Sequence, residues 1–214
     1  DPISFANVKG KGVGDGSDPV TLADYINSQF DPSLSWSDVE WFRSIWKGPI
    51  IIKGIQTVED AKIATDLNLE GIALSNHGGR QLDGAPAPFE LLDSVVQAVG
   101  GDIEIICDGG VRRGSDIAKA IALGADAVAI GHSVLMALNC NKAIPEADFP
   151  REMGVEAGYC YHCHTGRCPV GVATQDPELR KRLNPDDAAE RVYNFLHTLT
   201  IECQMMARAC GKTN

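Results

Sequence analysis

The sequence IALSNHGGRQLD, residues 72–83, decides the fold class and most of the predicted chemistry. Its first three residues are apolar, and polar and glycine residues follow at once, as at the carboxyl end of a buried strand. Proteins of the α/β class place their chemistry at such strand ends. His77 can take a proton near neutral pH, and Arg80 can hold a carboxylate through two parallel hydrogen bonds. This pair predicts a substrate that is both an acid and a proton donor.

Strand-like and helix-like segments alternate on both sides of this stretch. Strands are predicted over 49–53, 71–75, 103–108 and 127–131, and helices over 38–46, 58–67, 88–99, 115–123 and on to about 138. Ser37 and Thr57 are the expected N-caps of the first two helices. Apolar strands separated by helices predict a parallel sheet buried on both faces. The spacing is that of a (β/α)8 barrel, but only four of its eight units are present.

The bulk properties of the chain narrow the function classes. Its 214 residues are 44% hydrophobic and 22% charged, which is ordinary for a globular protein. The net charge of −10 argues against a nucleic-acid-binding surface. There is no apolar run of membrane-spanning length and no signal-peptide pattern. The seven cysteines are an odd number, which favours a reducing compartment over a disulfide framework, so we expect a cytoplasmic location.

Four sequence blocks occur in the order found in one enzyme family. They are DPSLSW at 31–36, IIIKGI at 50–55, SNHGGRQ within 72–83 and CDGGVRRG at 107–114. Together they make residues 1–135 resemble the FMN-dependent 2-hydroxy acid oxidases and dehydrogenases, such as glycolate oxidase and the lactate-oxidising enzymes. The resemblance implies that the four units are strands five to eight of the barrel. It leaves three origins for the missing half: the chain is a fragment, two half-barrels associate, or another chain supplies the rest.

The resemblance also implies roles for individual residues. His77 would take the hydroxyl or α proton of the substrate while a hydride equivalent moves to flavin N5, and Arg80 would bind the substrate carboxylate. Lys53 would lie near flavin N1 and O2, and Ser75 would bond the flavin edge. The FMN phosphate and ribityl chain would be held by Asp108, Gly109, Gly110, Arg112, Gly131 and His132, aided by a helix N-terminus. The family usually has arginine where this chain has His132, so a titratable charge replaces a permanent one.

The last third of the chain carries a different pattern. Its cysteines are spaced C-x2-C-x4-C, at Cys160, Cys163 and Cys168. This spacing suits thiolate ligation of an iron–sulfur cluster. Zinc, aided by His162 or His164, is a rival interpretation, and buried free thiols are another.

Residues 136–214 resemble the end of the glutamate synthase FMN barrel, especially its archaeal-type members. That resemblance implies a 3Fe–4S cluster and a C-terminal helix that starts near residues 185–187 and stops at Gly211. The family's first ligand cysteine falls at Ala157 here. Cys160 would then substitute for it, or Cys140 would join a four-cysteine site.

We therefore predict an FMN-binding half-barrel over residues 1–138, followed by a cysteine loop and a helix over 139–214. The predicted function is FMN-dependent oxidation of a small 2-hydroxy acid to a 2-oxo acid. One alternative is a glutamate synthase-like reductive amination, and another is an inactive barrel fragment or subunit. A homo-oligomer or a partner chain is expected to complete the barrel.

Overall fold

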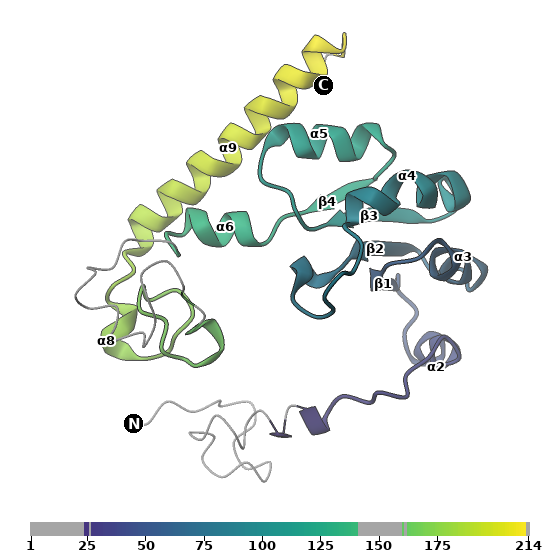
Figure 1. Ribbon diagram of the computed structural model, residues 1–214, viewed down its shortest axis with the longest axis horizontal. Helices are drawn as coiled ribbons and strands as arrows, with labels where there is room; N and C mark the ends of the chain where they lie inside the picture. The colour runs from purple at the N-terminus through teal and green to yellow at the C-terminus, as the bar shows by residue number, and fades with distance from the viewer. Residues whose placement is uncertain (1–23, 26, 141–159, 161, 213–214) are drawn as a thin grey trace. The chain divides into compact units, whose positions relative to one another are not determined.

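The computed structural model describes residues 24–25, 27–140, 160 and 162–212 (Figure 1). Its elements with defined bounds are α2 (Asp38–Ile45), β1 (Ile51–Ile55), α3 (Val58–Asp66), β2 (Gly71–Ser75), η2 (His77–Gly79), α4 (Pro88–Val99), β3 (Glu104–Asp108), α5 (Gly114–Ala122), β4 (Ala127–Ala129), α6 (His132–Ala137), η4 (His162–His164), α8 (Pro177–Arg180) and α9 (Pro185–Ala209). The chain divides into two compact units. One comprises Ser35–Ala137 with Arg191–Asn214 and holds the whole sheet. The domain boundary expected at residue 138 stays a prediction.

The sheet has the predicted parallel α/β arrangement. Its four strands pair in the order β1-β2-β3-β4, and each neighbouring pair is parallel. A bulge in β1 falls at Gly54, whose φ of 101° lies in a region that side chains rarely adopt. At the carboxyl end of the sheet, Ser75 of β2 lies opposite Asp108 of β3. Strands that follow one another along the chain also lie side by side, which is the topology of a βα barrel segment.

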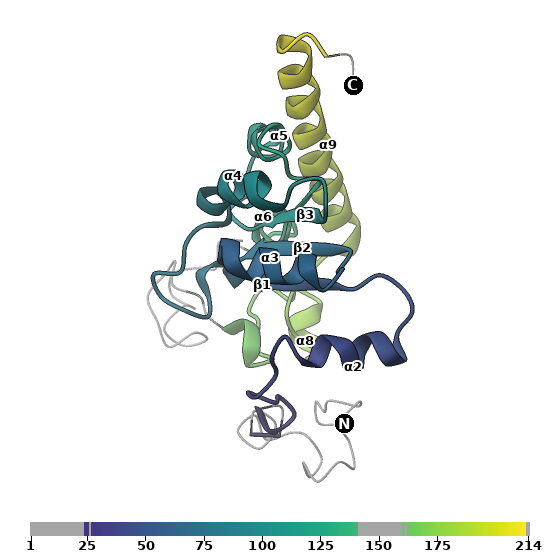
Figure 2. The same ribbon diagram turned by 90° about the vertical axis from the view of Figure 1, so that its right-hand side faces the viewer.

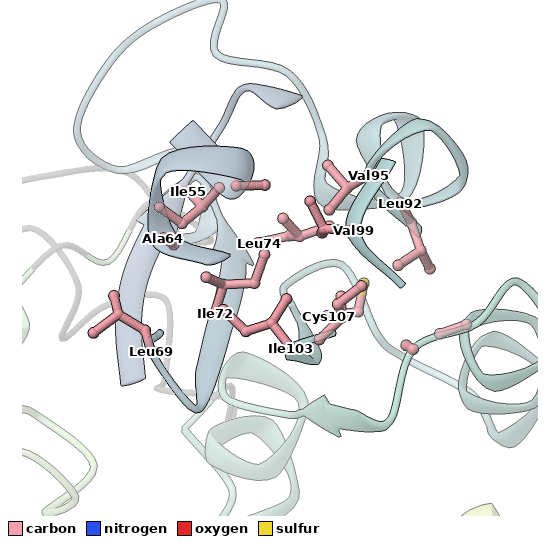
Figure 3. Packing of buried hydrophobic residues seen from close by; sticks show 14 of the residues in the cluster. Ile55, Ala64, Leu69, Ile72, Leu74, Leu92, Val95, Val99, Ile103 and Cys107 are labelled. Atoms are coloured by element: carbon pink, nitrogen blue, oxygen red, sulfur yellow. The ribbon is translucent and has the colours of Figure 1, made fainter. Parts of the chain in front are cut away.

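The hydrophobic core lies between the sheet and helices α3 and α4. Both helices lie against the same side of the sheet, with α3 along β1 and β2 and α4 along β2 and β3 (Figures 1 and 2). Ile72 and Leu74 of β2 are completely buried, as are Leu92 and Val95 of α4 (Figure 3). Burying one such side chain contributes about 1.5–3 kcal/mol. The central strand β2 is buried along its whole length, so its polar end is held firmly.

Most boundaries agree with the sequence predictions, and the exceptions have local causes. Strand β2 and helix α4 span the predicted residues, and Thr57 accepts a hydrogen bond from the Asp60 N–H at 3.0 Å, as an N-cap should. Ser37 lies at the predicted N-cap position of α2, but its backbone is helical and its side chain forms no capping bond. Strand β1 begins two residues later than predicted. Its predecessor Ile50 donates its N–H to the Glu70 carboxylate at 2.7 Å.

The C-terminal helix α9 packs on the start of α5 within the same compact unit. The Gly114 N–H donates to Glu202 Oε2 at 2.5 Å, and the Cys203 thiol donates to the Gly114 carbonyl at 3.1 Å. After α9 the chain turns at Gly211, whose φ is 74°, so the predicted stop is confirmed. None of the helices in the described residues combines the length and the hydropathy needed to cross a bilayer.

Candidate active site

Three neighbouring strands each contribute one polar side chain to the carboxyl edge of the sheet. Lys53 comes from β1, Ser75 from β2 and Asp108 from β3. Lys53 Nζ lies 2.7 Å from Asp108 Oδ2 and 3.1 Å from Ser75 Oγ. Ser75 Oγ donates to the same Asp108 oxygen at 2.6 Å. The structure therefore joins these three sequence-predicted site residues in one hydrogen-bonded network.

The charge state of Asp108 follows from this network. Burial alone would raise the pKa of its carboxyl. Hydrogen bonds from Lys53 and Ser75, with the positive charges of Lys53 and His77, outweigh that effect and hold the pKa below its ordinary value. Asp108 is therefore ionised near neutral pH, and the Lys53 ammonium is paired with it.

The SNHGG segment forms a tight turn directly after β2. His77 has a φ of 57°, and Gly78 and Gly79 have φ of 68° and 70°, so three successive residues are left-handed. The Asn76 side chain accepts a hydrogen bond from Gly79 N–H at 3.1 Å and donates to the Pro86 carbonyl at 3.3 Å. His77 and Arg80 are both exposed beside the buried strand end. The turn thus presents the predicted base and the predicted carboxylate clamp at the same edge of the sheet.

The glycine pair after β3 lies at that edge as well. Gly109 and Gly110 have φ of 121° and 74°, which a side chain would strain. The N–H groups of Arg112 and Arg113 both donate to Asp116 Oδ2 at 3.1 Å. Together with the Gly114 bond to Glu202, this means that the start of α5 is already filled by carboxylates of the chain. The helix N-terminus expected to aid a phosphate is thus occupied. Phosphate binding is left to side chains and to the loop of Gly109 and Gly110 after β3, called the glycine loop below.

Helix α6 brings the last two predicted residues near the turn. Gly131 is exposed, and a Cβ added there would meet no atom within 4 Å. The Nδ1 atom of His132 lies 3.9 Å from the position that a Cβ on Gly78 would take. Ser133 donates to the Val111 carbonyl at 2.6 Å and so ties α6 to the glycine loop. The supporting roles of Asn76, Ser133 and Asp116 were not predicted, although an asparagine before two glycines is a turn signal.

The loop that carries Cys160, Cys163 and Cys168 is held by hydrogen bonds of its threonines. Thr165 and Thr174 hold its backbone through bonds to the carbonyls of His162 and Gly166. Cys168 is buried, whereas Cys160 and Cys163 are exposed. Among the described residues, no three His, Cys, Asp or Glu side chains converge as metal ligands. Iron–sulfur and zinc binding therefore both stay predictions.

One further thiol belongs to the same part of the chain. Burial raises the pKa of the Cys140 thiol, and the charges of Cys163, Cys168 and Cys160 raise it further. Cys140 therefore lies within electrostatic range of the three loop cysteines. Ala157 and the side chain of His164 lie outside the described residues.

The family model described as FMN-dependent dehydrogenase matches residues 4–144, which is most of the chain. The chain belongs to the FMN-dependent dehydrogenase family. A second model, a conserved region of glutamate synthase, matches residues 152–213, so both predicted resemblances are confirmed.

Individual relatives of this family member support the same family assignment. An L-lactate dehydrogenase of Pseudomonas putida is 51% identical over 123 residues, which cover 56% of this chain and 32% of that protein. One from Yersinia pestis has the same identity and coverage. The chain thus spans about a third of the length of the curated relatives that it matches.

Solved structures place this family member in the barrel fold. The flavin-binding domain of baker's yeast flavocytochrome b2 matches with a TM-score of 0.59 at 31% identity, covering 86% of this chain and 36% of that one. An (S)-mandelate dehydrogenase, described as a monotopic membrane protein, matches with a TM-score of 0.57 at 38% identity, covering 63% and 35%. The predicted fold class is confirmed: the chain is part of a TIM-type barrel.

Proposed function

We propose that this chain supplies half of an FMN site that oxidises a small 2-hydroxy acid to a 2-oxo acid. The observation that carries the proposal is the network of Lys53, Ser75 and Asp108 at three adjacent strand ends, with His77 on the following turn. A cation, a base and a paired carboxylate at the carboxyl edge of a parallel sheet form a catalytic arrangement. The L-lactate dehydrogenase relatives support a substrate of the lactate type.

The chemistry divides among the residues by their position and charge. When bound, FMN would accept the two electrons that leave the substrate carbon. Lys53 supplies a positive charge, which favours an anionic reduced flavin. His77 accepts the substrate proton. Arg80 is exposed, and its planar guanidinium suits the substrate carboxylate.

Phosphate binding would depend on side chains more than on the start of α5. Its first N–H groups are engaged by Asp116 and Glu202. We therefore assign the phosphate to the Arg112 guanidinium, the His132 imidazole and the backbone of the glycine loop. Gly109 and Gly110 allow that backbone to approach a ligand closely.

The described residues contain the strands of half a barrel. A closed barrel of this type has eight strands, and the sheet formed by the described residues has four, with β1 and β4 at its edges. We propose that a second copy or a partner chain pairs with these edges. Light scattering after size-exclusion chromatography tests association of the isolated chain, and a mass of one chain would contradict pairing with a second copy.

The decisive experiment is an anaerobic flavin titration followed by addition of substrate. The chain should bind FMN, and L-lactate should bleach the oxidised flavin bands. Bleaching that fails with lactate or glycolate, together with turnover of 2-oxoglutarate and ammonia by the reduced protein, would favour the glutamate synthase-like alternative. A chain that perturbs no FMN spectrum would be an inactive fragment or subunit.

We further propose that the cysteine loop binds an iron–sulfur cluster in the native protein. The support is the match of residues 152–213 to glutamate synthase and the grouping of Cys140 with Cys160, Cys163 and Cys168. Anaerobically purified protein should contain iron and sulfide, and both should be lost in Cys163→Ser. Stoichiometric zinc would indicate a structural metal instead, and protein without metal would leave free thiols.

A further inference from the structure

One buried hydroxyl lies at the centre of the candidate site. Ser75 is only 2% exposed, and its Oγ contacts three other residues of the site. It donates to Asp108 Oδ2 at 2.6 Å and accepts from Lys53 Nζ at 3.1 Å. It also accepts from the backbone N–H of His77 at 3.1 Å. A single atom therefore links the predicted base to the predicted cation.

These three contacts use the whole hydrogen-bonding capacity of the hydroxyl. A serine hydroxyl has one hydrogen to donate and two lone pairs that accept. Asp108 takes the hydrogen, and Lys53 and His77 take the two lone pairs. No capacity remains for a bond to the flavin edge, which is the role that family resemblance implies for Ser75.

The contact with His77 fixes a conformation that is otherwise unfavourable. His77 has a φ of 57°, in the left-handed region that residues with a side chain rarely occupy. Its N–H is held by Ser75, and the turn is closed behind it by the Asn76 side chain bonded to Gly79 N–H. Because the backbone of His77 is fixed, the starting point of its imidazole is fixed as well.

The contact with Lys53 restrains a flexible side chain. The Lys53 side chain is 53% exposed, so solvent alone would leave its ammonium free to move through many rotamers. Asp108 and Ser75 together hold Nζ at one position over the strand ends. The Asp108 side chain is only 19% exposed, so this anchor is much better shielded than the lysine it holds.

We propose that Ser75 is a positioning residue, which sets the base His77 and the cation Lys53 relative to one another through one hydroxyl, and is not a flavin ligand. The proposal rests on the proposed function for the meaning of base and cation. The geometry itself can be tested without flavin. It predicts that loss of the hydroxyl loosens two catalytic elements at once, although neither of them is altered.

The test compares Ser75→Ala with a matched control, Ser94→Ala. Ser94 is an exposed serine of α4 whose hydroxyl bonds only to the Leu91 carbonyl of its own helix. In the protein without flavin, hydrogen exchange at the His77 amide should become at least tenfold faster in Ser75→Ala and stay unchanged in Ser94→Ala. Ser75→Thr, which keeps the hydroxyl, should restore most of the protection.

A second variant separates the two arms of the network and does not depend on Ser75→Ala folding. Asp108→Asn keeps an acceptor for the Ser75 hydroxyl but removes the charge that pairs with Lys53. His77 amide exchange should then stay within about twofold of the parent protein. The Lys53 ammonium should lose its ion pair with Asp108, so that its side-chain NMR signals should indicate faster motion than in the parent.

The flavin-bound protein supplies the opposing outcome. Ser75→Ala should change the midpoint potential of bound FMN, because Lys53 is loosened, while the FMN dissociation constant stays within about threefold. Unchanged His77 exchange together with a tenfold or greater loss of FMN affinity would overturn the proposal and make Ser75 a flavin ligand. If the parent protein binds no FMN, the proposed function fails, whereas the exchange measurements still decide the positioning role.

Discussion

Substituting Gly114 by alanine should separate the C-terminal helix from the rest of its unit. An added Cβ would lie 2.5 Å from the Cβ of Glu202 and 2.9 Å from the Cys203 backbone nitrogen, and closer still to the Leu199 carbonyl. Carbon atoms in good contact are about 3.5–4.0 Å apart, so α9 must move outward. Overpacking of this kind costs about 1–3 kcal/mol. Loss of the bond from Gly114 N–H to the Glu202 carboxylate costs about 1.5–3 kcal/mol.

Because both effects arise from the same displacement, we expect a combined loss of about 2–4 kcal/mol in the free energy of unfolding. For a chain of this size that corresponds to a fall in melting temperature of roughly 5–15 °C. Thermal unfolding followed by circular dichroism measures it, and hydrogen exchange should report lost protection in α9. Gly131→Ala is the control for stability, because no atom lies within 4 Å of the added Cβ. An alanine variant as stable as the parent, with α9 equally protected, would refute the packing of α9 on α5.

Three other predictions concern the site and its surroundings. His77→Ala should slow the reduction of bound FMN by L-lactate about 10²–10⁴-fold in stopped-flow measurements while the flavin stays bound. The lowered pKa of Asp108 means that its carboxylate stabilises the fold at pH values above the ordinary aspartate pKa of about 4. This contribution is lost as the pH falls through the pKa in the folded state. Urea titrations of Asp108→Asn should therefore show a free energy of unfolding that depends less on acid pH than that of the parent. Burial, and secondarily the charge of Asp108, raises the pKa of the Cys107 thiol to about 11, so a maleimide at pH 8 should label Cys107 only after unfolding. Cys163 is exposed, so the maleimide should label it at once in the folded, metal-free protein.

Segments with strong signals at both ends were predictable from the sequence. Strand β2 is an apolar run between Gly71 and the polar Ser75, and α4 starts at Pro88 and ends before Gly100. Both were predicted with the observed bounds. Strand β1 was placed two residues too early because Gly54 suggests a strand end. The structure instead keeps Gly54 within the strand as a bulge, a feature that depends on pairing with β2.

The candidate site was predictable as a set of strand ends but not as a network. Each of Lys53, Ser75 and Asp108 directly follows an apolar run, so their common edge could be inferred. Which of them touch depends on the register of three strands, and the bulge at Gly54 changes that register within β1. The sequence pattern does not fix the register between strands whose contacting residues are 22 and 33 positions apart along the chain. The central position of Ser75 therefore emerged only from the structure.

The contact between α5 and α9 shows how the two family segments are combined in one chain. Gly114 belongs to the part that matches FMN-dependent dehydrogenases, and Glu202 to the part that matches glutamate synthase, 88 residues further on. Their bond lies within one compact unit, which also contains the sheet. The Glu202 carboxylate lies where a helix N-terminus would attract an anion, directly after the glycine loop that we assign to FMN. The last part of α9 thus stabilises the start of α5 and leaves the ligand to the glycine loop and its neighbouring side chains, so this end of the second segment belongs to the same compact unit as the sheet.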